Sequence, residues 1–247
     1  MNSILSFLPH EEHIRAAPDF QLSSSESNLL ITLLNQEDQH QYNELLNISL
    51  PIHIQQLLHE LSLLLHLSSS TTWMITILLK QLIIQKHSLD LLTVVACVTL
   101  SFKYQQLSSQ TIDYELIAKC CQIDNIQHIH DAEVDLLDLF SYDISVTTPD
   151  HFFSYLSNVN NNLKEIVEQA QSLLSISSYA YETYQLLHNY PCSIVVLSLM
   201  YTITSNTFTI EQIKNFVTHK KDAVHYSDQL LNCITQIQNI FSSCCLH

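Results

Sequence analysis

The chain has 247 residues, of which 47% are hydrophobic, and a formal net charge of −15 when histidine is counted as neutral. It contains no glycine. This excludes a glycine-rich phosphate loop, a dinucleotide-binding turn and a nucleophile elbow, because each needs glycine for a tight turn or close backbone approach. The negative charge argues against nucleic-acid binding, since the phosphate backbone requires a basic face.

Neither the cysteines nor the apolar segments indicate secretion or membrane insertion. The seven cysteines are scattered over helical segments with no signal peptide ahead of them, which is typical of reduced thiols in an intracellular protein. The longest apolar runs, near residues 74–84 and 91–100, are about ten residues long, whereas a bilayer span needs roughly twenty. We therefore expect a protein of the nucleus or cytoplasm that does not contact membranes.

Residues 1–46 are polar and mixed in character, and we expect them to form an N-terminal arm. Pro9, Pro18 and the serine run at residues 23–25 belong to this stretch. The arm either packs partly on the body of the protein or stays loose.

Residues 47–144 have the periodicity of five helices with short connections. Pro51 opens the first helix, where proline is tolerated, and residues 68–71 supply an N-cap for the second. The third helix is apolar on nearly every face, so it is expected to be the buried centre of a bundle. The expected helices lie at about residues 51–66, 71–87, 88–106, 110–121 and 126–141.

Residues 145–247 repeat this pattern after an extended connector at residues 145–148. The segment that begins at Pro191 is again apolar all round, so it is expected to be the centre of a second bundle. The sequence thus predicts an all-α fold of two five-helix bundles, with residues 94–100 and 194–200 the most buried. Helices are expected at about residues 149–157, 161–175, 178–188, 191–204, 210–218 and 223–242.

Several motifs in this order resemble the cyclin family. They are Ser-Phe-Lys-Tyr at residues 101–104, Glu133 in the fifth helix, Tyr-Asp-Ile at residues 142–144, and Thr-Pro-Asp-His-Phe-Phe at residues 148–153. The last of these, with Tyr-Pro-Cys-Ser-Ile at residues 190–194, is most similar to D-type cyclins. The resemblance implies two cyclin boxes. It also implies a regulatory subunit, not an enzyme, that binds and activates a cyclin-dependent protein kinase, controls cell-cycle progression and needs no cofactor.

The resemblance further implies a kinase-binding surface. In the family, the lysine and glutamate that match Lys103 and Glu133 form its centre. We expect both to be exposed and outside the core, with Phe102, Leu137 and Ile144 as apolar neighbours. A cation at one helix end and a carboxylate on a neighbouring helix can jointly bind backbone groups of a docked helix. An isolated pair of this kind is more often an ordinary surface ion pair.

Other positions depart from the family pattern. Gln105 and Gln106 stand where two acidic residues usually follow the lysine. Pro51 replaces an arginine of the first helix, and Lys80 replaces the aspartate that normally pairs with it. Losing both ends of an ion pair avoids leaving one charge buried alone, which is typical of a divergent cyclin.

The first helix also matches the family's docking patch for kinase substrates and inhibitors. Leu50, Ile54, Leu57 and Glu60 stand at helical spacing on one face, with leucine in place of the usual tryptophan at Leu57. The alternative is an amphipathic face that packs into the core.

Two other functions stay open at this point. A cyclin-fold adaptor or scaffold would bind other proteins without activating a kinase, and Gln105 and Gln106 leave room for it. A carrier of lipids or small molecules is supported only by the apolar content.

No metal site or lipid anchor is expected. The pair Cys120 and Cys121 with nearby histidines matches no standard zinc module. His10 and His13 lack the rest of a zinc-protease motif. Residues 244–247 have only the outline of a prenylation box, because histidine is an unusual last residue.

Overall fold

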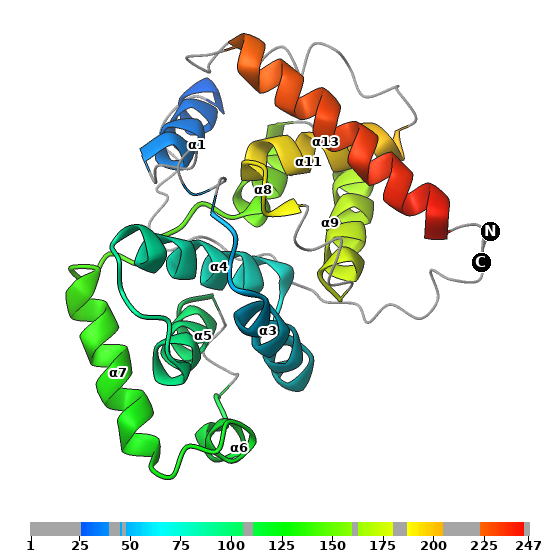
Figure 1. Cartoon of the computed structure of the whole chain (residues 1–247). Helices are drawn as coiled ribbons and strands as arrows, with labels where there is room; N and C mark the ends of the chain where they lie inside the picture. The colour runs from blue at the N-terminus through cyan, green and yellow to red at the C-terminus, as the bar shows by residue number, and fades with distance from the viewer. Residues whose placement is uncertain are drawn as a thin grey trace. The chain divides into compact units, whose positions relative to one another are not determined.

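The computed structural model is all-α throughout the residues that it describes, which are 26–39, 45, 48–105, 111–159, 163–179, 187–204 and 223–244 (Figure 1). Ten helices lie within these ranges: α1 (Glu26–Gln39), α3 (Ile52–Leu65), α4 (Ser69–Ile84), α5 (Leu91–Gln105), α6 (Tyr114–Cys120), α7 (Ile126–Leu139), α8 (Pro149–Val159), α9 (Lys164–Tyr179), α11 (Cys192–Ile203) and α13 (Ala223–Cys244). The predicted all-α class is therefore confirmed. The helices expected at 178–188 and 210–218 lie largely or wholly outside the described residues.

The chain divides into two compact units that interleave along the sequence. The α4–α7 unit contains the described residues of Gln36–Thr148 and Ser177–Pro191, and the α8–α13 unit contains those of Met1–Asn35, Pro149–Ile176 and Cys192–His247. The chain thus changes unit next to the predicted connector, and the described residues of 177–191 belong to the α4–α7 unit again. The division into cyclin boxes at residues 47–144 and 145–247 stays a prediction.

Helix α5 forms the centre of the α4–α7 unit. Its residues 94–102 are all buried, and both α4 and α7 pack against it (Figure 1). Because the helix is apolar on nearly every side, burial on all faces removes the most apolar surface from water. The prediction that residues 94–100 are buried is confirmed.

Helix α11 has the same role in the α8–α13 unit. Its residues 192–200 are all buried, and it packs against α8 and α13. The predicted burial of residues 194–200 is thus confirmed as well. Part of the predicted N-terminal arm also belongs to a packed helix, since Leu30, Leu33 and Leu34 of α1 are buried.

The helix ends show how this sequence forms caps. The Ser68 side chain accepts a hydrogen bond from the backbone of Thr71 at 3.1 Å, which is the predicted N-cap of α4. Glycine usually occupies positions with a left-handed backbone conformation, but here other residues adopt it. Within the described residues these are His66, Lys86, Gln122, Ser141 and Tyr142, with φ between 49° and 63°.

None of the described helices combines the length and the apolar character that a membrane span requires.

Candidate functional site

Lys103 and Glu133 connect the end of α5 to the middle of α7. Lys103 Nζ donates a hydrogen bond to Glu133 Oε2 at 2.6 Å. Lys103 lies in the last turn of α5, where a cation also interacts favourably with the helix dipole. The Lys103 side chain is 44% exposed, whereas that of Glu133 is 6% exposed. The sequence-matched pair therefore forms, with only its cation at the surface.

The expectation that Glu133 is exposed is wrong. Glu133 lies on the buried face of α7, in helical register with Ile129 and Leu136, which are buried as well. This face packs against α5, so the carboxylate is removed from most of the solvent. A buried carboxylate is stable only when hydrogen-bond donors surround it.

Three side chains supply these donors to Glu133. Besides Lys103, the Tyr114 hydroxyl donates to Oε1 at 2.8 Å, and His130 Nδ1 lies 3.3 Å from Oε2. Burial raises the pKa of Glu133, but the hydrogen bonds from Lys103 and Tyr114 and the charge of Lys103 outweigh it, so the pKa lies below its usual value. Glu133 is thus a carboxylate at neutral pH.

Two aromatic rings complete the arrangement. The rings of Tyr114 and His130 lie 4.5 Å apart between centroids, and Lys103 Nζ lies 5.1 Å from the centre of the Tyr114 ring. A cation at this distance is attracted to the face of an aromatic ring. Burial, together with the hydrogen bond and charge of Glu133, raises the pKa of Tyr114, which keeps the hydroxyl a donor. We call Lys103, Tyr114, His130 and Glu133 the Lys103 cluster.

Sequence reasoning missed Tyr114 and His130 as members of this site. Two signals could have found them. His130 precedes Glu133 by three residues, which places it on the same helix face. Asp113 caps α6 by accepting from the backbone of Leu116, which fixes Tyr114 as the first residue of that helix.

The apolar candidates around the pair are less exposed than a docking surface requires. Phe102 and Ile144 are buried, and Leu137 is half-buried. The exposed large apolar side chains nearby in sequence are instead Tyr104, Val134 and Tyr142. Phe102 and Ile144 therefore offer a partner little accessible surface.

The four docking-patch candidates separate into two groups. Leu50 and Ile54 are buried, whereas Leu57 is half-buried and Glu60 is exposed. Helix α3 begins at Ile52 after Pro51, so Leu50 precedes the helix. The core-packing alternative therefore holds for Leu50 and Ile54.

Lys80, which departs from the family pattern, is buried in the α4–α7 unit. The expectation that the joint replacement avoids a lone buried charge is therefore wrong, because lysine is itself a cation. Lys80 Nζ donates to the backbone oxygen of His188 at 3.0 Å, and the rings of His188 and Trp73 lie 4.2 Å apart. Burial lowers the pKa of Lys80 to about 8. Burial and the charge of Lys80 also lower the pKa of His188 well below its usual value. These contacts hold His188 against α4.

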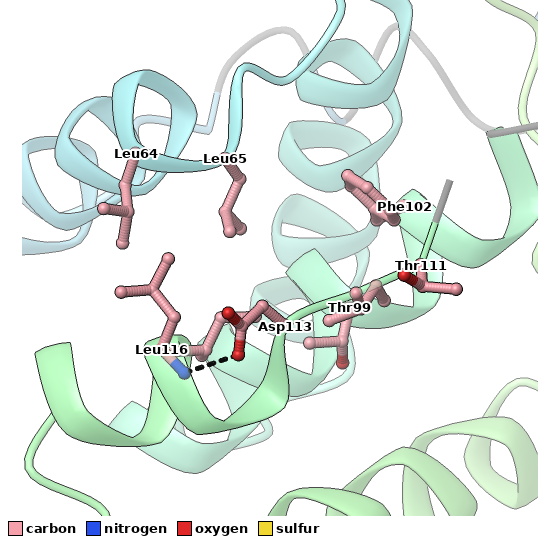
Figure 2. A pocket seen from close by; sticks show the side chains of 9 residues that line it. Leu64, Leu65, Thr99, Phe102, Thr111, Asp113 and Leu116 are labelled. Atoms are coloured by element: carbon pink, nitrogen blue, oxygen red, sulfur yellow. Dashed lines mark hydrogen bonds between the residues drawn. The ribbon is translucent and has the colours of Figure 1, made fainter. Parts of the chain in front are cut away.

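A cavity of about 190 Å³ lies between the end of α3, the middle of α5 and the start of α6. Figure 2 shows Leu64 and Leu65 on one side of it and Thr99, Phe102 and Leu116 around it. The Asp113 carboxylate at its edge caps α6. The cavity is therefore mainly apolar, with its carboxylate already engaged.

Potential metal ligands do not gather within the described ranges, where no group of three His, Cys, Asp or Glu side chains could hold an ion. His10, His13 and residues 245–247 lie outside those ranges.

Comparison with known proteins gives a match in structure alone. No family model matches the chain, and no curated protein matches its sequence. The X-ray structure of a viral cyclin from herpesvirus saimiri matches with a TM-score of 0.59, covering 85% of this chain and 96% of that chain at 15% sequence identity. The chain has a cyclin-like fold. The all-α cyclin-like architecture expected from the sequence motifs is thereby confirmed.

Proposed function

We propose that this protein is a cyclin-like regulatory subunit that binds and activates a cyclin-dependent protein kinase and so controls cell-cycle progression. The observation that carries the proposal is the 2.6 Å pair of Lys103 and Glu133, formed at the matched positions of a cyclin-like fold. The kinase supplies the catalytic residues. Docking holds its mobile C-helix inward, which completes the lysine–glutamate pair that positions ATP. We expect the complex to act in the nucleus or cytoplasm.

Lys103 is suited to bind a partner because its charge is accessible and held in place. Its ammonium group has three N–H donors, and one is used by Glu133. The remaining donors belong to a side chain that is 44% exposed. Exposed Tyr104 and Val134, each next in sequence to a residue of the pair, add apolar area. A charged centre with apolar neighbours is a common form of interface anchor.

The proposal is tested by measuring the affinity of Lys103→Ala for a panel of purified cyclin-dependent kinases on a biosensor. Truncating a charge that an interface buries typically costs about 2–5 kcal/mol, so affinity should fall by at least about 30-fold. Lys119→Ala is the matched control, because Lys119 is an exposed lysine in the last turn of α6. Equal affinity of wild type and Lys103→Ala for every kinase that binds would contradict the proposal.

A cyclin-fold adaptor is the second candidate. It is favoured by Gln105 and Gln106, which replace the acidic residues of the family pattern, and by the engagement of the Glu133 carboxylate within the protein itself. The two candidates are separated by adding a saturating amount of this protein to a kinase that binds it and measuring phosphorylation of a substrate peptide. Binding that leaves kinase activity at its basal rate would establish the adaptor.

A further inference from the structure

The Glu133 carboxylate has little remaining capacity to accept hydrogen bonds from a partner. Lys103 and His130 occupy Oε2, and Tyr114 occupies Oε1. A carboxylate offers about four lone-pair sites, and here the side chain is only 6% exposed. If a partner presents backbone N–H groups to this face, another acceptor has to receive them.

The contact with Glu133 decides which ring nitrogen of His130 bears the hydrogen in a neutral imidazole. A carboxylate only accepts hydrogen bonds, so the Nδ1 atom that lies 3.3 Å from Oε2 must carry the proton. In a neutral imidazole the other nitrogen, Nε2, is then an acceptor. Nε2 is separated from Nδ1 by one ring carbon, and its lone pair points away from the Nδ1–H bond. The side chain is 41% exposed. The Tyr114 ring, 4.5 Å away, restrains the orientation of the imidazole.

We infer that His130, through Nε2, is the acceptor that this surface offers to a partner's backbone, beside the donor Lys103. Both side chains contact the same oxygen of Glu133, so a donor and an acceptor on two partly exposed side chains lie next to each other. Such a pair complements the N–H and C=O groups of a polypeptide chain. Tyr114 and Glu133 are positioning residues that hold the donor and the acceptor in register. The inference rests on the proposed function, because it names how the Lys103 cluster binds the kinase.

Two substitutions of His130 separate its two nitrogens. The side-chain amide of asparagine reaches the place of Nδ1, whereas that of glutamine reaches the place of Nε2. His130→Asn keeps a donor to Glu133 and loses the outward acceptor, so affinity for the purified kinase should fall about tenfold. His130→Gln keeps an outward carbonyl oxygen and should bind within about threefold of wild type.

The control is His128→Asn, since His128 is an exposed histidine on the same helix. Thermal unfolding of each variant, followed by circular dichroism, shows whether it is folded. Wild-type affinity in His130→Asn, or an equal loss in the asparagine and glutamine variants, would overturn the inference. If Lys103→Ala still weakens binding in that case, the proposed function stands. If Lys103→Ala binds normally, the proposed function fails.

Discussion

Lys80 Nζ donates a hydrogen bond to the backbone oxygen of His188, 108 positions further along the chain, at 3.0 Å. The lysine is 3% exposed and the histidine 4% exposed. The contact therefore places a cation and an imidazole together inside the α4–α7 unit, where both resist protonation.

The burial of Lys80 predicts how stability changes at high pH. Its pKa is about 8 in the folded protein and 10.5 in an unfolded chain, so the unfolded state binds more protons between these values. The free energy of unfolding, relative to that of Lys80→Met, should rise with pH over this window by up to about 3 kcal/mol. Urea unfolding of both proteins from pH 7 to 10 measures it. Parallel curves for the two proteins would show that the charge of Lys80 is not penalised.

The burial of His188 predicts a loss of stability in acid. Its folded pKa lies well below 6.5, so the unfolded chain takes up a proton that the folded protein does not. Stability attributable to His188 is present above pH 6.5 and is lost as the pH falls, by about 1.4 kcal/mol per pH unit. His188→Phe, which keeps a ring beside Trp73, should unfold with a shallower pH dependence. The check is urea unfolding from pH 7 to 5, and identical slopes would count against the prediction.

Glu133 is predicted to contribute to folding as well as to binding. Glu133→Ala removes the acceptor of Lys103, Tyr114 and His130, and leaves the Tyr114 hydroxyl without its acceptor. We expect a loss of about 1–3 kcal/mol in the free energy of unfolding. Asp135→Ala is the control, because Asp135 is an exposed carboxylate two residues along α7. A change for Glu133→Ala no larger than that of the control would mean that the buried contacts contribute nothing.

The exposed half of the docking patch should affect substrate choice and leave kinase affinity unchanged. Glu60→Ala is expected to bind the kinase as wild type does, because Glu60 lies on α3, whereas the Lys103 cluster comes from α5, α6 and α7. The KM for a long protein substrate should rise in Glu60→Ala, while the KM for a short peptide should stay the same. Ile54→Ala, in contrast, should destabilise the fold by about 2–5 kcal/mol, since Ile54 is buried. A loss of kinase affinity in a folded Glu60→Ala variant would place α3 in the kinase interface.

The sequence predicts the helices of the α4–α7 unit well, because their signals are local. Pro51 and Ser68 mark two starts, and apolar runs mark the buried interior. The exposure of Glu133 is predicted wrongly, because a match to a family motif does not show which face of the helix packs inward. The spacing to Ile129 and Leu136 contains that information. The Lys80 contact is beyond sequence reasoning, since its acceptor is a backbone oxygen far along the chain.

The absence of glycine also affects the unfolded state. Five described positions adopt left-handed backbone without glycine, and each such residue costs roughly 1–2 kcal/mol in the folded chain. The unfolded chain, in turn, has fewer backbone conformations to lose, because every residue carries a Cβ atom. Glycine in place of His66 would relieve the strain after α3 and enlarge the unfolded ensemble at the same time. These two effects on the free energy of unfolding have opposite signs. The strain at the helix ends lowers it, and the more restricted unfolded chain raises it.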